Sequence, residues 1–180
     1  MNNKPRMKFT SLQIQNSLAV TLGTIFDNRG SLIRIWEENL VLKEFKLIQA
    51  SIVTNPVAGT FRGLHFQSEP YSENKVIQCV SGKVFDVILD LRKDSSTYKK
   101  HIEIEIGPEC EYQGLFIPAG CAHGYLTLEP NSTLIYFMDK VYSSENSQGI
   151  RWNDSKLSIN WPRKPTLVSQ QDLQWPELET

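Results

Sequence analysis

The sequence predicts an all-β fold, a double-sheet jelly roll with short helices and an irregular C-terminal tail. Two observations lead to this prediction. Several short segments alternate apolar and polar residues, which is the period of a strand with one face toward a core. These segments are about five to eight residues long, and turn-forming residues separate them at roughly every eight to twelve positions, as in sandwiches and barrels. A jelly roll closes two such sheets on each other and protects most strand edges.

Length and composition favour one domain over residues 1–180. A chain of 180 residues can bury a full core. Its formal net charge of −1 favours neither nucleic acid nor a membrane surface as a partner. The N-terminus lacks the apolar stretch of a secretory signal, and no apolar run reaches the ~18 residues of a membrane span. Three widely spaced cysteines without a C-x-x-C pair fit a reducing cytoplasm better than a disulfide framework.

The N-terminal third is predicted to hold an edge element, a turn, a helix and a strand. Residues 8–22 mix strand formers with polar residues, which suits an edge strand or an arm that pairs with another subunit. Residues 25–30 read as a strand end and turn, because Asp and Asn favour turns. Residues 32–45 are the best helical candidate in the chain, and residues 46–57 return to a period of two.

The segment 60–92 is predicted to be the centre of the fold. Residues 76–80 and 84–91 read as strands, and Ser81-Gly82-Lys83 has the length and the glycine of a hairpin loop. In the second strand, alternate residues are apolar and would share one face, and the other face would contain Asp86 and Asp90. This pattern predicts an antiparallel strand covered on one side, with polar residues free to point into a barrel mouth, where ligands often bind.

Four further strands and a tail are predicted after residue 92. The strands are expected at residues 101–106, 114–117, 123–128 and 133–142, with turns between them. From Gly149 onward, three tryptophans and three prolines predict an irregular tail that packs back on the barrel.

Two of the three histidines, His65 and His123, lie among other residues that suit chemistry. Either histidine alone is explained by partial burial with a satisfied hydrogen bond. Together with Arg62, Lys75 and Tyr136 on neighbouring predicted strands, they predict a functional site. Histidine is the usual general base near neutral pH, lysine and arginine stabilise anions or hold phosphate, and tyrosine can return a proton.

A metal site is the weaker alternative for the same residues. Pro118-x-Gly120-x-x-His123 resembles the second half of the cupin metal signature. The first half would be represented only by His65-x-Gln67 and the more distant Glu73. Two histidines with a poor third ligand are weak for a transition metal, so neither a metal nor a cofactor is expected.

Ordered motifs along the chain resemble those of the dTDP-4-dehydrorhamnose 3,5-epimerase family, over roughly Phe26 to Asp172. The matching segments are residues 62–67, 75–76, 82–87, 90–95, 117–124, 134–136, 149–154 and 159–162. The resemblance implies a cupin-like double-stranded β-helix. It also implies an epimerase of a nucleotide-activated 4-keto-6-deoxyhexose, which inverts carbon 3, carbon 5 or both by enolisation next to the ketone, in deoxysugar biosynthesis.

The resemblance also implies a catalytic role for four residues. His65 resembles the base that removes the proton, and Asp172 resembles the carboxylate that orients this histidine. Lys75 resembles the cation that stabilises the enolate oxygen. Tyr136 resembles the acid that returns a proton from the opposite face, which inverts the centre.

Four more residues are implied as substrate contacts. His123 is expected to line the pocket, Arg29 and Arg62 to contact the diphosphate, and Gln49 to contact the nucleotide. Some neighbouring positions differ from the family pattern and leave the nucleobase open. These are Leu32, Arg34, Val141 and Ser147, where the family commonly has Phe, Glu, Tyr and Glu.

A homodimer is expected, because the N-terminal strand has no obvious partner, two-fold dimers are the commonest assembly, and the family's subunits exchange N-terminal strands. A second hypothesis from another class stays open at this point. The chain could be a cupin that binds sugar nucleotides without turnover, or a metal-dependent cupin enzyme. Bound metal or the absence of isotope exchange would distinguish these from an epimerase.

Overall fold

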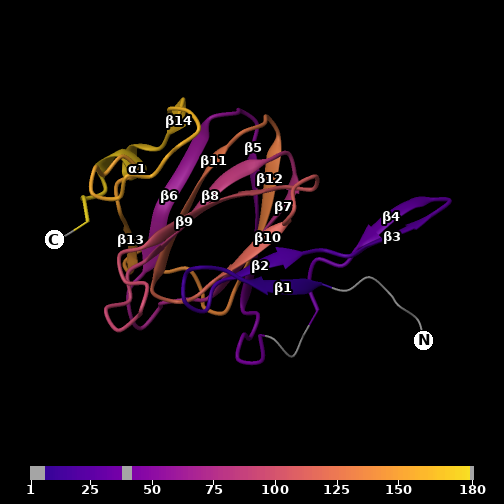
Figure 1. The fold of residues 1–180 in the computed structure, drawn as a ribbon, viewed down its shortest axis with the longest axis horizontal. Coiled ribbons are helices and arrows are strands. Elements are labelled where there is room, and N and C mark those ends of the chain that lie inside the picture. Colours follow the sequence, from indigo (N-terminus) through magenta and orange to yellow (C-terminus); the bar gives the residue numbers. More distant parts are fainter. Residues whose placement is uncertain (1–6, 38–41, 179–180) are drawn as a thin grey trace.

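Two sheets that face each other form the body of the protein (Figure 1), and the computed structural model describes residues 7–37 and 42–178. The first sheet contains, in spatial order, β1 (Lys8–Ser11), β2 (Leu18–Thr21), β10 (Gly114–Ile117), β7 (Lys75–Ser81), β12 (Ser132–Met138) and β5 (Gln49–Asn55). The second contains β13 (Ser147–Gly149), β6 (Thr60–Gln67), β11 (Cys121–Thr127), β8 (Val84–Asp90) and β9 (His101–Ile106), with β14 (Leu167–Val168) parallel to β6. The predicted all-β, cupin-like jelly roll is confirmed.

The core lies between the sheets and on both of their outer faces. Ile77 and Leu134 of the first sheet meet Ile88 and Tyr125 of the second in one cluster of fully buried side chains. The outer face of the second sheet is covered by the C-terminal tail, in which Leu157 is buried. The predicted packing of this tail against the barrel is confirmed, and it matters because the tail brings residues to the site.

The N-terminal residues form two hairpins. β1 and β2 pair with each other, and β1 is an edge strand of the first sheet, as predicted for residues 8–22. β3 (Thr24–Asp27) and β4 (Gly30–Ile33) form a separate two-stranded sheet with a turn between them, which confirms the predicted strand end and turn. This second hairpin extends away from the barrel (Figure 1).

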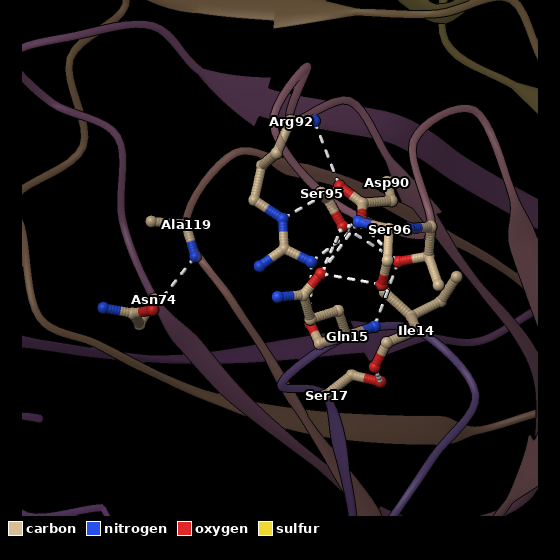
Figure 2. Close-up of polar contacts among 10 residues, drawn as sticks. Ile14, Gln15, Ser17, Asn74, Asp90, Arg92, Ser95, Ser96 and Ala119 are labelled. Atoms are coloured by element: carbon tan, nitrogen blue, oxygen red, sulfur yellow. Dashed lines mark hydrogen bonds and ion pairs between the residues drawn. The ribbon is translucent and has the colours of Figure 1, made fainter.

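A buried carboxylate anchors the loop between β1 and β2 (Figure 2). Asp90 is fully buried and accepts hydrogen bonds from both Arg92 Nε and Nη2, at 2.8 Å each. Arg92 Nη2 also donates to the Gln15 carbonyl oxygen at 2.7 Å, and Gln15 Oε1 accepts from the Ser96 amide at 2.9 Å. The end of β8 is thereby tied to the N-terminal hairpin.

The predicted hairpin at Ser81-Gly82-Lys83 is wrong. β7 belongs to the first sheet and β8 to the second, so this loop crosses between the sheets. Gly82 has a φ of +70°, and a Cβ there would lie 2.4 Å from Ser132 Oγ. The misreading arises because a short glycine loop between two strands serves a hairpin and a sheet-to-sheet crossover equally well.

The prediction that residues 84–91 are covered on one side is also wrong. Asp86 and Ile88 face the space between the sheets, whereas Val87 and Leu89 are buried beneath the tail. Because the tail covers the outer face, both faces of β8 are buried, and alternation of residue type no longer marks a solvent face.

The predicted helix at residues 32–45 is not present in the described part of that range. β4 occupies its start, residues 34–37 are irregular, residues 42–44 form a turn, and residues 38–41 lie outside the described residues. Apolar side chains here cover the first sheet instead: Trp36 lies 5.1 Å from Phe45 and 5.2 Å from Phe137 between ring centroids. Within the described ranges α1 (Gln170–Gln174) is the α-helix, and no helix is long and apolar enough to span a bilayer.

Candidate active site

A cavity of ≈ 540 Å³ opens between the two sheets and is bounded on one side by the tail. Its polar lining includes Arg62, His65, Lys75, His123, Tyr136 and Asp172. A second cavity of ≈ 170 Å³ shares His65, Lys75, Tyr136 and Gln171 with the first. The two are therefore parts of one cleft, with His65, Lys75 and Tyr136 at its centre.

A β-bulge directs Arg62 and His65 into the same cleft. Residues three apart on a regular strand point to opposite faces. On β6, however, His65 pairs with His123 and Arg62 pairs with Tyr125, so one extra residue is inserted between the pairs. Gly63 takes a φ of +137° in this bulge, and a Cβ there would lie 2.4 Å from the Gly124 Cα. The glycine is thus required for the close approach that aligns the two side chains.

Lys75 and Tyr136 reach the cleft from the opposite sheet. Lys75 pairs with Met138 on β12, and Tyr136 is two residues before Met138 on the same face of that strand. His65 and His123 pair across β6 and β11 of the second sheet. The cleft is consequently lined by an imidazole pair on one side and by an ammonium and a phenol on the other.

His65 and Asp172 form a dyad between β6 and the tail. His65 Nε2 lies 2.6 Å from Asp172 Oδ1, and the aspartate is almost fully buried. Burial alone raises the pKa of a carboxyl, but the hydrogen bond and charge of His65, with the hydrogen bonds from the Gly63 amide and the Trp175 indole, outweigh burial and hold the pKa of Asp172 below its usual value. An ionised Asp172 accepts a hydrogen bond from Nε2–H, so that Nδ1 is left as the basic nitrogen of His65.

Lys75 is held by a buried ion pair. Its Nζ lies 2.7 Å from Glu73 Oε1, and both residues are more than nine-tenths buried. Glu73 Oε2 accepts from Gln67 Nε2 at 2.9 Å, and Gln67 Oε1 accepts from the Ser143 amide at 2.6 Å. This chain of contacts fixes the ammonium at the wall of the cleft, where it can neutralise a developing anion.

His123 and Tyr136 lie next to each other beside a second buried carboxylate. Their ring centroids are 6.2 Å apart, and His123 Nε2 lies 2.8 Å from Asp86 Oδ2. Among the described residues, Asp86 Oδ1 is buried without a hydrogen-bond partner. Burial raises the pKa of Tyr136 well above its usual value, and the nearby Tyr125 and Asp86 raise it further. The phenol of Tyr136 therefore holds its proton at neutral pH and can donate it.

The predicted substrate contacts differ in whether they line the cleft. Arg62 is exposed at the cavity, with Nε donating to Asn55 Oδ1 at 2.9 Å. Gln49 Oε1 accepts from the Tyr142 amide at 2.9 Å; Tyr142 lines the smaller cavity, whereas Gln49 does not. Arg29 lies in the turn between β3 and β4, with its side chain 84 % exposed and paired with Asp27. Within the described chain, the cleft brings together the predicted catalytic residues with Arg62 and His123, but neither Arg29 nor Gln49 lines it.

The positions that differ from the family pattern separate into two groups. Ser147 lines the smaller cavity, as does Tyr142, the neighbour of Val141. Leu32 and Arg34 lie on or just after the projecting hairpin, away from the cleft lining. The changes near the cleft therefore concern its smaller cavity and leave the residues around His65 and Tyr136 in place.

Three residues of the site were missed or misread in the sequence. Glu73, considered as a metal ligand, instead pairs with Lys75. Asp86 is the partner of His123, and its position within an apolar strand was the available signal. Trp175 contacts Asp172, and nothing in the sequence marked it. Among residues 7–37 and 42–178, no group of three or more His, Cys, Asp or Glu is arranged to hold a metal ion.

Comparison with known proteins identifies the family. The family model for dTDP-4-dehydrorhamnose 3,5-epimerase matches residues 11–180. A dTDP-4-dehydrorhamnose 3,5-epimerase of Sinorhizobium fredii is 36 % identical over 176 residues, which cover 96 % of this chain and 90 % of that protein. The crystal structure of a Bacillus anthracis protein of the same name, with TDP and pyrophosphate bound, superposes with a TM-score of 0.89 at 33 % identity, over 96 % of this chain and 99 % of that one.

A more distant relative has the same fold. The crystal structure of NovW, a 4-keto-6-deoxy sugar epimerase from Streptomyces spheroides, gives a TM-score of 0.87 at 26 % identity, over 98 % of this chain and 90 % of that one. The match of the family model over nearly the whole chain agrees with the order of the motifs and with the residues gathered in the cleft. The chain therefore belongs to the dTDP-4-dehydrorhamnose 3,5-epimerase family.

Proposed function

We propose that the cleft inverts carbon 3, carbon 5 or both of a dTDP-linked 4-keto-6-deoxyhexose, with His65 as the base and Tyr136 as the acid. The protein is an epimerase, and hence an isomerase, of deoxysugar biosynthesis. The observation that supports these roles best is that one cavity has a proton acceptor on one sheet and a proton donor on the facing sheet. His65 has a buried carboxylate behind it, and Tyr136 keeps its proton on the facing sheet.

Proton removal begins at His65. The ketone at carbon 4 acidifies the hydrogens on carbons 3 and 5, so a histidine can remove one of them. Asp172 stabilises the imidazolium that forms, as the acid of a catalytic triad does. The carbon–hydrogen bond breaks, its electron pair moves into the enolate, and the enolate oxygen is stabilised by the ammonium of Lys75.

Inversion follows when the proton returns from the other side. Tyr136 donates its phenolic proton to the enolate carbon, and the carbon–oxygen double bond re-forms. Proton exchange with water then restores the imidazole and the phenol, so the product carries one hydrogen from solvent at the inverted carbon. The ketone itself accepts the electron pair, so the proposed chemistry needs no metal or organic cofactor.

The diphosphate is proposed to lie at the outer end of the cleft. Arg62 is exposed there and presents a guanidinium, the group best suited to paired phosphate oxygens. Gln49 is proposed to act on the nucleotide through Tyr142. Gln49 accepts a hydrogen bond from the Tyr142 amide, and Tyr142 lines the smaller cavity. We further propose that residues 1–180 act as one domain in the cytoplasm.

We also propose a homodimer in which the β3–β4 hairpin reaches a second copy. Arg29 lies at the tip of a hairpin that projects from its own barrel, and Phe26 on the same hairpin is 77 % exposed. An exposed aromatic on a projecting strand gains most by burial against another chain. In that arrangement Arg29 contacts the diphosphate in the neighbouring cleft.

The experiment that tests the function is isotope exchange in deuterated water with dTDP-4-keto-6-deoxyglucose. The expected result is deuterium at carbon 3, carbon 5 or both, with inverted product, and a His65→Ala variant that loses both. The same variant still exchanging at the rate of the unaltered protein would disprove the base assignment. Binding without any exchange would instead favour a sugar-nucleotide-binding protein without turnover.

A further inference from the structure

Trp175 contacts the aspartate of the dyad. Its indole Nε1 donates to Asp172 Oδ1 at 3.2 Å, and this is the same oxygen that lies 2.6 Å from His65 Nε2. The Trp175 and His65 rings also meet edge to face, with centroids 6.0 Å apart and planes at 70°. One carboxylate oxygen thus receives two ring N–H groups, and the second ring packs against the first.

A glycine provides the space for this indole. Gly149 on β13 pairs directly with His65 on β6. A Cβ on Gly149 would lie 2.5 Å from Trp175 Cε2 and 2.6 Å from both Cδ2 and Nε1. Since real Cβ atoms do not approach a ring so closely, any side chain at Gly149 must displace the indole. No φ in the left-handed region is recorded for Gly149, so an alanine there acts on the ring rather than on the backbone.

The backbone around Trp175 is held by contacts that do not involve the indole. Arg151 donates from its amide to the Pro176 carbonyl at 2.8 Å and from Nε to the Trp175 carbonyl at 3.2 Å. Further along, the Leu178 amide donates to Asp154 Oδ2 at 2.6 Å. Changing the ring of Trp175 therefore leaves the path of the tail in place, and the effect of the indole can be measured separately.

We propose that Trp175 is a positioning residue for the proposed base: its N–H fixes the Asp172 carboxylate toward His65, and Gly149 makes room for it. This inference rests on the proposed role of His65. Without the indole N–H, Oδ1 keeps one donor instead of two, and only His65 and the Gly63 amide, which donates to Oδ2 at 3.4 Å, still orient the carboxylate. Its charge is also less dispersed, so it attracts the His65 proton more strongly.

These two consequences give a recognisable signature. Loss of orientation lowers kcat with little change in KM, because Trp175 does not line the cleft. A stronger pull on the imidazolium moves the acid limb of the kcat/KM profile to higher pH, since that limb reports protonation of the base in the free enzyme. Loss of a residue that merely stabilised the fold would neither move the acid limb of the kcat/KM profile nor lower kcat selectively at constant KM.

The test compares Trp175→Phe with a matched control, Trp161→Phe. Trp161 Nε1 donates to the Trp152 carbonyl at 2.9 Å, so the control also loses one indole hydrogen bond, but away from the dyad. Trp175→Phe is expected to lower kcat about 3- to 10-fold, the usual range for one hydrogen bond, and to raise the pH of the acid limb. Gly149→Ala, which displaces the ring without removing it, is expected to act in the same direction. The double variant should be no worse than the more impaired single variant.

Equal kcat and equal pH profiles for Trp175→Phe and Trp161→Phe would overturn the proposal. A further measurement needs neither turnover nor a variant: the indole N–H resonance of Trp175 in the unaltered protein should shift with pH, whereas that of Trp161 should not. A Trp175 resonance that is independent of pH would also overturn the positioning role. Failure of the proposed function looks different. The unaltered protein would then show no isotope exchange, or His65→Ala would retain it, whatever the behaviour of Trp175.

Discussion

His65 Nε2 and Asp172 Oδ1 lie 2.6 Å apart although 107 residues separate them in the sequence. The first residue belongs to the central strand β6, and the second belongs to the short helix α1 in the tail. Ser169 caps that helix through its Oγ, which accepts from the Asp172 amide at 3.0 Å. The dyad therefore depends on the docking of the tail as much as on the barrel.

Asp172→Asn is expected to reduce kcat by at least about 10²-fold with KM nearly unchanged. The uncharged amide stabilises an imidazolium less than a carboxylate does. Its NH₂ group can also donate a hydrogen bond to Nε2, which holds His65 in the tautomer with the proton on Nδ1. Steady-state kinetics on a dTDP-4-keto sugar measure the effect. Glu177→Gln is the matched control, because Glu177 is an exposed carboxylate in the same tail. Equal losses in both variants would show that charge on the tail matters, not the dyad.

Tyr136→Phe is expected to separate proton removal from inversion. His65 can still form the enolate, but no phenol returns a proton from the opposite face, so deuterium exchange should exceed the yield of inverted product. The rate of inversion is expected to fall by about 10²- to 10³-fold, as for loss of a general acid. NMR of the product locates deuterium and configuration together. Tyr98→Phe, on the surface, serves as the control. Undiminished inversion by Tyr136→Phe would require another acid.

Lys75→Met is expected to lower kcat about 10²- to 10³-fold, because the enolate oxygen loses its cation. Glu73→Gln keeps the cation and so affects kcat less, but it leaves a buried ammonium without a counter-charge. We expect that variant to lose roughly 3 kcal/mol of unfolding free energy, measured by urea denaturation. Lys83→Met is the control, since its ion pair with Glu105 spans 3.6 Å at the surface and is worth little. The assignment fails if Lys75→Met and Lys83→Met have the same kcat.

The sequence predicted strands well wherever one face of a strand meets the core. Residues 101–106 alternate isoleucines with polar residues and form β9. Connections between strands were harder to predict: the glycine loop at residues 81–83 joins two sheets because β7 and β8 each find their partners elsewhere in the chain. The prediction of a helix at residues 32–45 was wrong because the aromatic residues of this segment pack on the face of a sheet. Local periodicity does not distinguish this packing from that of a helix.

The site was predictable only in part. His65, Lys75 and Tyr136 lie in recognisable motifs, and their alternation on strands places them in one cleft. Asp172 was inferred from resemblance alone, because no local signal links a tail residue to β6. The contact of the Trp175 ring with Gly149 could not be predicted from the sequence, because it follows from the tertiary path of the tail.

Asp90→Asn is expected to destabilise the fold by roughly 2 kcal/mol at neutral pH, because Arg92 then lacks its buried counter-charge. The contacts of Asp90 with Arg92, Ser95 and Thr97 outweigh burial and lower the pKa of Asp90 in the folded protein. The folded state thus binds this proton less readily than the unfolded chain. The contribution is complete above the ordinary pKa of about 4 and is lost as the pH falls below it.

Urea denaturation at pH 7 and at lower pH measures this contribution. The difference in unfolding free energy between the unaltered protein and Asp90→Asn should shrink as the pH falls below about 4. Asp94→Asn, an exposed carboxylate in the neighbouring loop, should show no such difference at either pH. A difference for Asp90→Asn that is independent of pH would mean that shape, not charge, explains the loss.

Arg29 provides the last prediction, a complementation between subunits. If the hairpin serves the cleft of a second copy, Arg29→Ala and His65→Ala should each be nearly inactive alone. A mixed dimer, however, has one cleft with an intact His65 that receives Arg29 from the other chain. Mixing the two variants after dissociation should therefore restore activity at one of the two clefts in each mixed dimer. If Arg29 instead acts on its own chain's cleft, every cleft in the mixture lacks one of the two residues and no activity returns.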